Sequence, residues 1–240
     1  MKEVRFFYAP DAAVNCELPE EEAAHAVRVL RLTAGDEILL MDGKGSFYRA
    51  EITEANKKHC LYAIRECMPQ EPQWSGHLHL AMAPTKNIDR TEWFAEKATE
   101  IGFDELTFLR TAFSERTVVK DERMDKILIS ATKQSHKAWK PRLNSMVDFK
   151  RFVAQDHPGG KFICHCYEED SMVPKVLLKD VLKADEDALV LIGPEGDFSI
   201  EEVKLAEQNG FVSVSLGKSR LRTETAALVA VHLMNLAHEL

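Results

Sequence analysis

Residues 189–202 read LVLIGPEGDFSIEE, and this junction decides the fold of the second half of the chain. The apolar strand pattern 189–192 runs directly into a loop with two glycines, and a helix pattern begins after Ser199. Ser199 and Glu202 have the spacing of a capping box. In an open α/β sheet, ligands bind just beyond the carboxyl end of a strand, so the loop is a candidate binding site. A tight turn that needs glycine for its geometry alone would give the same pattern.

A second junction of the same kind follows at residues 212–225, which read VSVSLGKSRLRTET. The strand pattern 212–216 leads into Gly217, and the final helix opens at Thr223. Neither junction is a phosphate-binding loop, because position 212, five residues before Gly217, is not glycine, and no G-x-G-x-x-G run follows the first strand of this half. The sequence therefore argues against a nucleoside triphosphate and against a classical NAD site.

The remaining pattern divides the chain into two domains. From residue 77 onward, strands alternate with helices, which predicts a mainly parallel sheet covered by helices. Residues 1–72 instead predict a small β-barrel, with a hairpin around Asp42-Gly43 and one short helix over 19–30. The polar, proline-containing stretch 68–73 is the predicted linker, so the expected domains are 1–72 and 73–240. In the second domain we expect strands at 78–83, 105–109, 161–167, 188–192 and 212–215, and helices at 88–101, 121–137, 199–209 and 223–238.

Net charge alone argues against a nucleic-acid partner, but the charge is unevenly distributed. The 240 residues carry a formal charge of −8, with 45% hydrophobic and 29% charged residues, a globular composition. Residues 110–151 contain eleven Lys and Arg against five Asp and Glu, a net charge of +6. Within them, residues 135–142 interleave His and Trp with cations, which suits an unpaired RNA loop. A solvated helix face with an inward Trp is the competing interpretation.

The cysteines and apolar runs indicate a cytoplasmic protein. No secretory signal is visible at the N-terminus, and the longest apolar run, 226–231, is too short to span a bilayer. Five cysteines without framework spacing indicate reduced thiols. Cys164-His165-Cys166 has no second Cys/His cluster at zinc-site spacing, so we expect a strand there and no metal.

Taken together, residues 192–199, 216–217 and 221–226 closely resemble the RsmE family. These are ribosomal RNA methyltransferases of the knotted SPOUT class, which methylate N3 of a uridine in 16S rRNA. The resemblance extends over 5–7, 25–31, 86–102, 114–116 and 134–135. The family usually has glycine where Asp197 stands, and arginine where His136 stands.

The resemblance implies a PUA-like β-barrel that helps hold RNA, followed by a SPOUT α/β domain with a trefoil knot. It also implies S-adenosylmethionine as the methyl donor, bound by the two glycine-containing loops. The cofactor-binding residues would be Ile192, Gly193, Pro194, Glu195, Gly196, Leu216, Gly217, Leu221 and Thr223. From the charge pattern and the resemblance together, the expected RNA contacts are Arg28, Arg31, Lys86, Arg116, Lys133, His136, Lys137 and Arg142. The expected partner is 16S rRNA or the small ribosomal subunit.

Methylation of uridine N3 requires removal of the N3 proton and stabilisation of the negative charge that develops on the base. Arg222 is the candidate for orienting the base and stabilising its anionic form. Glu195 or Glu224 would accept the proton, directly or through water. A glutamate in the first turn of a helix is also favoured by the helix dipole alone, which leaves a purely structural role open for Glu224.

Two further alternatives remain at this level. One is a sister SPOUT enzyme that methylates a ribose 2′-hydroxyl or a tRNA base, which the identity of the motifs disfavours. The other is a non-catalytic RNA-binding module whose glycine loops are merely turns. The final helix is apolar on more than one face, so it is either buried in its own domain or part of an interface. Because SPOUT proteins are typically homodimers, we expect a homodimer through the C-terminal domain.

Overall fold

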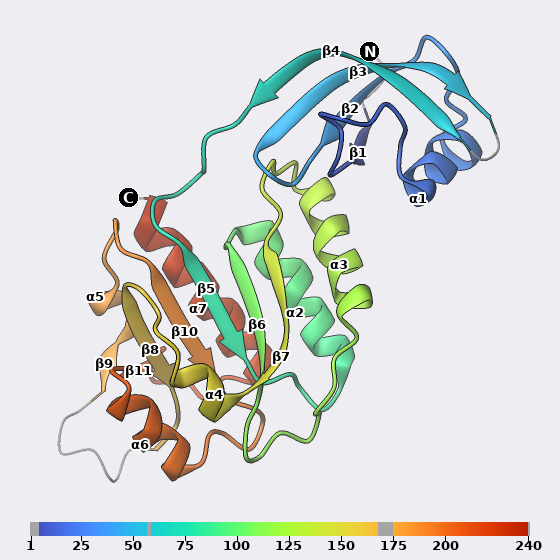
Figure 1. The fold of residues 1–240 in the computed structure, drawn as a ribbon. Coiled ribbons are helices and arrows are strands. Elements are labelled where there is room, and N and C mark those ends of the chain that lie inside the picture. The colour runs from blue at the N-terminus through green and yellow to red at the C-terminus, as the bar shows by residue number, and fades with distance from the viewer. Residues whose placement is uncertain (1–4, 57–58, 168–174, 240) are drawn as a thin grey trace. The chain divides into compact units, whose positions relative to one another are not determined.

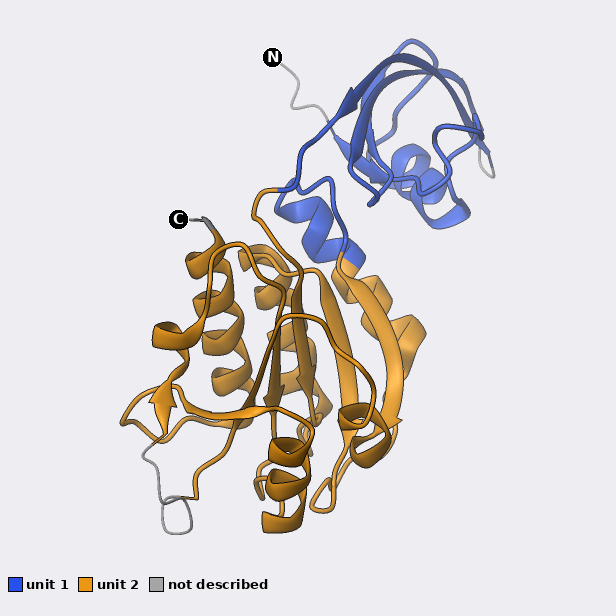
Figure 2. Cartoon of the chain, turned by 60° about the vertical axis from the view of Figure 1, so that its left-hand side comes forward, with its two compact units in different colours: residues 1–72, 129–140 blue, residues 73–128, 141–240 orange. Residues whose placement is uncertain are grey.

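The computed structural model describes residues 5–56, 59–167 and 175–239. The chain forms two compact units (Figure 2): Met1–Pro72 with Ile129–Lys140, and Gln73–Leu128 with Pro141–Leu240. The sequence-based boundary at residue 72 coincides with the end of the first of these segments. The segment Ile129–Lys140, which the sequence assigns to the second domain, clusters with the N-terminal unit instead.

The N-terminal unit contains a four-stranded sheet in the order β1-β2-β3-β4, in which β1 is parallel to β2 and the other pairs are antiparallel. The predicted hairpin is confirmed, because the Asp42 carboxylate accepts hydrogen bonds from the backbone N–H groups of Lys44 and Ser46, at 2.7 and 2.9 Å. The strand β4 extends into the predicted linker, because Met68 and Pro69 belong to it. The strands are β1 (Phe6–Tyr8), β2 (Glu37–Met41), β3 (Ser46–Ala55) and β4 (Cys60–Pro69).

One short helical stretch lies in the same unit. Three glutamates occupy the first turn of α1 (Glu20–Ala24), where the helix dipole favours negative charge. The helix continues as a π-helical turn, η1 (His25–Val29). Arg31 follows this helical stretch, and it has a left-handed φ of 56°. Alternate strand residues and the inner face of α1 form the core of the unit: Phe7, Ala23, Ile38, Leu40, Ile52 and Tyr62.

The second unit contains a seven-stranded sheet in the order β7-β6-β5-β10-β8-β11-β9, and all of its pairs are parallel. This confirms the predicted parallel sheet (Figure 1). Strand β10 lies between β5 and β8, although both precede it in the chain. The trefoil knot stays a prediction. The strands are β5 (Leu78–Met82), β6 (Glu105–Arg110), β7 (Arg142–Asp148), β8 (Gly160–Cys164), β9 (Val176–Leu177), β10 (Ala188–Ile192) and β11 (Val212–Ser215).

Two of these strands, β7 and β9, were not predicted, and β8 is shorter than predicted. Strands β7 and β9 are the two edge strands of the sheet. The sequence of β7 is largely polar and β9 has only two residues, so neither shows a hydrophobic alternation that could be recognised. Strand β8 ends at Cys164 instead of Tyr167. The Cys166 N–H is bonded to the Asp197 carboxylate at 2.8 Å and is not available to a neighbouring strand.

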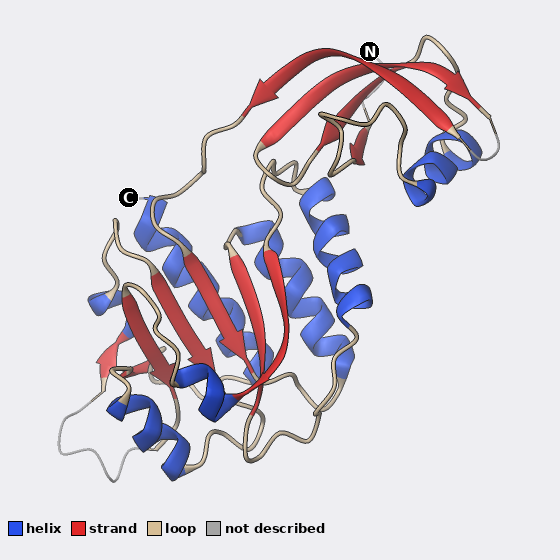
Figure 3. Cartoon of the chain, viewed as in Figure 1, coloured by secondary structure: helices blue, strands red, loops and turns tan. Residues whose placement is uncertain are grey.

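The helices cover both faces of the sheet (Figure 3). On β10, Val190 and Ile192 point to the core shared with α2, α5 and α7, whereas Leu189 and Leu191 point to the core shared with α4 and α6. Helix α3 stops three residues before the predicted end, because His136 has a left-handed φ of 53°. The helices are α2 (Ile88–Ile101), α3 (Asp121–Gln134), α4 (Phe149–Val153), α5 (Leu178–Val181), α6 (Ile200–Gln208) and α7 (Thr223–Glu239).

Candidate cofactor and substrate site

The two glycine-containing loops leave the sheet at its carboxyl edge, where open α/β sheets bind their ligands. The strands that precede them, β10 and β11, are separated by β8 alone. The first loop is anchored to the loop after β5, since the Glu195 carboxylate accepts a hydrogen bond from the Lys86 N–H at 2.9 Å. The predicted capping box is present, with Ser199 and Glu202 bonded reciprocally. The loop is therefore held in place at both ends.

Two glycines in these loops are required by the backbone. A Cβ on Gly193 would lie 3.1 Å from the Phe198 backbone nitrogen and 3.2 Å from the carbonyl carbon of Asp197. Gly217 has a φ of 126°, which residues with side chains rarely adopt. The exposed backbone at Gly217 allows a ligand to approach the main chain closely, whereas the missing side chain at the buried Gly193 lets the first loop fold back against Phe198. These loops therefore fit a cofactor held by backbone groups.

Asp197 stands where the family usually has glycine, and its backbone explains that preference. Its φ of 68° is left-handed, a conformation that Asp tolerates better than most residues with side chains. The carboxylate accepts hydrogen bonds from the backbone N–H groups of Phe198 and Cys166, both at 2.8 Å. Asp197 thus replaces glycine by bonding its side chain to the loop and to the segment after β8.

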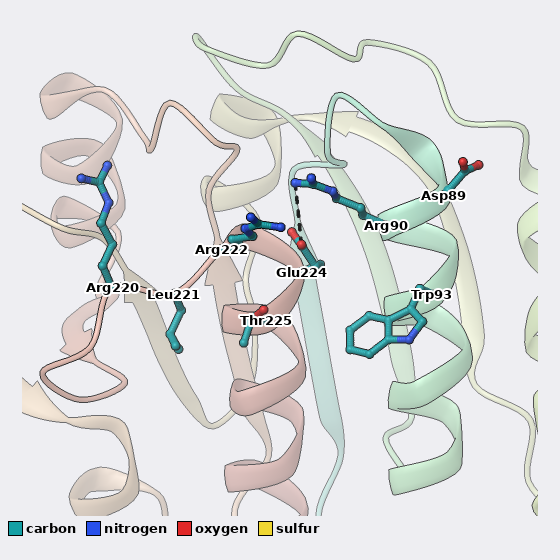
Figure 4. Close-up of a pocket in the computed structure, with 8 residues that line it drawn as sticks. All are labelled: Asp89, Arg90, Trp93, Arg220, Leu221, Arg222, Glu224 and Thr225. Atoms are coloured by element: carbon teal, nitrogen blue, oxygen red, sulfur yellow. Dashed lines mark ion pairs between the residues drawn. The ribbon is translucent and has the colours of Figure 1, made fainter.

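A pocket of about 610 Å³ lies beside the second loop (Figure 4). It brings together three of the residues predicted for the site, Leu221, Arg222 and Glu224. The rest of the lining comes from the same loop and helix start and from α2. These further residues are Arg220 and Thr225, and Asp89, Arg90 and Trp93 of α2.

The three α2 residues were missed by the sequence reasoning. A signal for them was present, because Asn87 caps α2 directly after β5, with its side chain accepting a hydrogen bond from the Asp89 N–H. This is a third junction of strand, loop and helix at the carboxyl edge of the sheet. Its lack of glycine left it unrecognised.

Glu224 is the residue in this pocket with the least satisfied side chain. It is 7% exposed, and one carboxylate oxygen lies 3.8 Å from the Arg90 guanidinium. Its other oxygen, Oε2, is buried and has no hydrogen-bond partner among the described residues. A buried carboxylate oxygen without a partner is costly in a folded protein. Arg222 is exposed and points toward Glu224 and Arg90 (Figure 4), so the three side chains form a charged site in which Oε2 of Glu224 is the unpartnered acceptor.

The other predicted cofactor residues do not line this pocket. Ile192 at the end of β10 is buried, as are Gly193 and Pro194 of the first loop, whereas Glu195 and Gly196 are exposed. In the second loop, Leu216 is half-buried and Gly217 is exposed, while Thr223 is buried at the start of α7. The structure thus places all nine predicted cofactor residues at the carboxyl edge of one sheet, but only one of them, Leu221, lines the pocket.

Several of the expected RNA contacts bond to groups of the protein itself. Lys86 pairs with Glu115 at 2.6 Å, and Arg116 donates to the carbonyl oxygens of Thr85 and Lys86. Lys133 is bonded to both oxygens of Glu22 at 2.6 and 2.9 Å. His136 stacks on Phe6, whereas Lys137 is half-buried and Arg28, Arg31 and Arg142 are exposed. The basic segment 110–151 is divided between the two units and is not one continuous element.

Within residues 5–56, 59–167 and 175–239, no group of three or more His, Cys, Asp or Glu side chains is arranged to hold a metal ion. The five cysteines are all free thiols. In the same part of the chain, no helix has the length and apolar character needed to cross a membrane.

Two protein-family models match the chain, and they define its class. An RNA methyltransferase PUA domain matches residues 18–63, and an RNA methyltransferase domain matches residues 72–235. The chain is thus an RNA methyltransferase, with a PUA-like β domain followed by a parallel α/β SPOUT domain, as the resemblance implied.

Relatives along the whole chain identify the particular family. Ribosomal RNA small subunit methyltransferase E of Rickettsia conorii is 27% identical over 90% of this chain and 87% of its own, and that of Bacillus subtilis is 28% identical over 96% and 93%. A probable rRNA-methyltransferase from Porphyromonas gingivalis is 41% identical, with a TM-score of 0.91 over 98% of both chains. The enzyme of Neisseria gonorrhoeae, solved with S-adenosylmethionine, is 26% identical, with a TM-score of 0.82 over 98% of both chains. The chain belongs to the ribosomal RNA small subunit methyltransferase E (RsmE) family.

Proposed function

We propose that this protein transfers the methyl group of S-adenosylmethionine to N3 of a uridine in 16S rRNA, as free RNA or within the small ribosomal subunit. The names of its relatives support the rRNA substrate, and the Neisseria gonorrhoeae relative supports the cofactor. The observation that carries the proposal is the unpartnered, buried Oε2 of Glu224 in a pocket that also contains Arg222. Such an oxygen is suited to accept a hydrogen bond, and then a proton, from a weakly acidic N–H group.

The glycine-containing loops would hold the cofactor. The cofactor residues would be 192–196, 216–221 and Thr223, and the exposed backbone at Gly217 fits close approach by a ligand. When bound, S-adenosylmethionine supplies an electrophilic methyl group. The loops contribute position, and positioning of two reactants supplies a large share of the rate in a displacement reaction.

The pocket residues would act on the base. Glu224 accepts the N3 proton, and Arg222 stabilises the negative charge on the pyrimidine ring. Arg90 holds the Glu224 side chain through its ion pair at 3.8 Å. Glu195 already accepts a hydrogen bond from the Lys86 N–H, which favours a positioning role for it and Glu224 as the proton acceptor.

We further propose that the protein acts as a homodimer through its C-terminal domain, in the cytoplasm. The inner face of α7 packs in its own domain, with Ala227, Ala230 and Met234 fully buried. The large apolar residues of the same unit that nevertheless remain exposed include Trp93 on α2 and Leu236 on α7, each 45% exposed. Exposed apolar residues of this size are typical of an interface when they form a patch. Light scattering at micromolar concentration tests this, and a monomeric mass would contradict it.

The decisive experiment is mass mapping of 16S rRNA from a strain that lacks the enzyme, with and without added protein and S-adenosylmethionine. A methyl group on the uracil ring supports the proposal. A methyl group on a ribose, or on tRNA alone, would identify a different SPOUT activity. Calorimetry with S-adenosylmethionine excludes a simple RNA-binding module if heat is released.

The role of Arg222 is tested by Arg222→Ala, with Arg65→Ala as the matched control. Arg65 is exposed and pairs with Glu51 on the surface of the N-terminal unit, where such pairs contribute about 0–1 kcal/mol. Loss of one stabilising group for a developing negative charge lowers kcat by about 10²- to 10³-fold. Full methylation by Arg222→Ala with unchanged cofactor affinity would show that the assigned role is wrong.

A further inference from the structure

A second pocket, of about 280 Å³, lies within the N-terminal unit. Its walls come from two parts of the sequence, the segment 5–30 and the segment 130–136. Arg5, Lys133 and two histidines, His25 and His136, line it. None of its lining residues, all in the described part of the chain, is Asp or Glu, although the whole chain carries a net charge of −8. The pocket therefore suits an anionic or electron-rich ligand.

An aromatic stack forms one wall. The rings of Phe6 and His136 are 4.4 Å apart and inclined by 22°, and Phe6 also meets the edge of Phe47 at 5.5 Å. Phe6 is half-buried and His136 is exposed. A ring that is stacked on one face and still exposed has its other face available to a further planar group. Bases of unpaired RNA stack on aromatic side chains in this way.

Two backbone irregularities flank the pocket. His136 holds a left-handed φ of 53°, and such conformations are costly and cluster at functional sites. On the other side, the Leu30 N–H bonds to the His25 carbonyl at 3.0 Å, which closes a π-helical turn. Single π-helical turns are frequent at functional sites as well. Both irregularities involve residues whose side chains line the pocket.

Two cationic side chains line the pocket, Lys133 and Arg5. The Lys133 ammonium is neutralised by Glu22 at 2.6 Å, and it lies 6.0 Å from the Phe7 ring centroid, so Lys133 forms part of the wall. Arg5 is the exposed arginine of the lining. An aromatic wall with a guanidinium at its edge matches a nucleotide, whose base stacks while its phosphate meets the cation. A peptide would supply no planar group of this kind unless it presented an aromatic side chain.

We propose that this pocket binds one unpaired nucleobase of the RNA substrate, stacked on the ring of His136, with Arg5 at the adjoining phosphate. The inference rests on the proposed RNA methyltransferase function and adds to it a base-binding subsite in the unit that does not contain Arg222 and Glu224. The subsite selects substrates with a single-stranded nucleotide that can enter the pocket.

The test compares His136→Asn and Phe6→Leu with the wild-type protein. Asn tolerates a left-handed backbone, so His136→Asn removes the ring without adding strain. Phe6→Leu keeps apolar volume and removes the stacking partner. The matched control is His59→Asn, an exposed histidine of the same unit that pairs with Glu17 outside the pocket. Calorimetry with S-adenosylmethionine shows in each case that the methyltransferase domain is intact.

The readout is the affinity for a fluorescent single-stranded oligouridine, measured at one fixed salt concentration. Loss of one base stack weakens binding by about 5-fold to 150-fold in His136→Asn, with a smaller loss in Phe6→Leu and none in the control. Binding of a fully paired RNA of equal length stays unchanged. In photo-crosslinking with 4-thiouridine, peptides that contain Phe6 or His136 become labelled.

Wild-type affinity in both pocket variants would overturn the inference, and so would crosslinks confined to residues 73–128 and 141–240. This failure is distinguishable from failure of the proposed function. If the wild-type protein methylates 16S rRNA while His136→Asn binds and methylates like wild type, the subsite is wrong and the enzyme assignment stands. If the wild-type protein transfers no methyl group, the proposed function itself is wrong.

Discussion

Acidification from pH 7 to pH 4 is expected to destabilise the methyltransferase domain through His79. This histidine of β5 is 8% exposed, and its Nε2 lies 2.8 Å from the Thr107 hydroxyl. The Phe152 ring covers it, with centroids 5.7 Å apart. Burial disfavours the charged imidazolium and lowers the pKa of His79 from 6.5 to about 4.

The size and sign of the effect follow from this pKa. Between pH 6.5 and about 4, the unfolded chain binds a proton at this histidine that the folded protein does not bind. The free energy of unfolding therefore falls as the pH falls through this window and is unaffected by His79 above it. With about 1.4 kcal/mol for each pKa unit, the full loss is about 3 kcal/mol at pH 4.

The neighbouring His77 acts in the opposite direction and has to be separated from His79, whereas its partner Glu105 loses its contribution only below the pH range of the test. The Nε2 of His77 lies 2.8 Å from the Glu105 carboxylate, which raises the pKa of His77, and the same hydrogen bond lowers the pKa of Glu105 to about 2. A raised histidine pKa stabilises the fold fully below pH 6.5, and that contribution is lost as the pH rises through the raised value. The Glu105 contribution is complete above about pH 4.5 and is lost only toward pH 2.

Urea unfolding at several pH values between 7 and 4 measures the effect in wild type and in His79→Gln. The variant should lose most of the decrease in unfolding free energy, whereas His77→Gln should show a steeper decrease than wild type. His232→Gln, which changes an exposed histidine of α7, is the control and should follow the wild-type curve. The reasoning is refuted if His79→Gln keeps the full wild-type decrease.

Three other variants test the cofactor and substrate site and the hydrogen bonds that hold its first loop in place. Glu202→Ala should lower the urea unfolding free energy by about 3 kcal/mol, because this buried carboxylate accepts hydrogen bonds from the Ser199 and Ala112 N–H groups at 2.9 and 2.8 Å. Gly217→Ala should weaken cofactor binding about tenfold in calorimetry, because a φ of 126° is strained for alanine by about 1–2 kcal/mol. Glu224→Gln keeps the side-chain shape and should retain cofactor affinity, while kcat in methyl transfer falls by about 10²- to 10⁴-fold.

Each of these variants has an outcome that contradicts its premise. Wild-type stability of Glu202→Ala would mean that water replaces both hydrogen bonds. Unchanged cofactor affinity in Gly217→Ala would remove the second loop from the cofactor site. Wild-type turnover in Glu224→Gln would leave Glu224 with the structural role that the helix dipole alone explains.

Local sequence patterns were sufficient to predict most strands of the parallel sheet and the part of the pocket that comes from the second loop and the start of α7. Strand β10 has a run of apolar residues long enough to be recognised, and Ser199 and Glu202 mark the start of α6 by their spacing alone. The loop at Gly217 and the start of α7 were found in the same way. Edge strands β7 and β9 were missed, because each pairs with only one neighbouring strand and also faces solvent, so its sequence need not be apolar.

Contacts between distant segments were decided only by the tertiary structure. Arg90 and Trp93 lie some 130 residues before Arg222 in the chain, and they share its pocket because parallel strands bring the loops at their carboxyl ends to one edge of the sheet. The stacking of Phe6 on His136 in the N-terminal unit likewise joins two residues that are far apart in the chain.

The sequence by itself therefore determined the class of fold, the family and the two loops that carry its motifs, since periodicity, capping and glycine spacing are short-range properties. The tertiary structure decided which charges are already paired, as Lys133 is with Glu22, and which remain open, as Oε2 of Glu224 does. The physical reason is that burial and pairing depend on neighbours that are close in space and far apart in the chain.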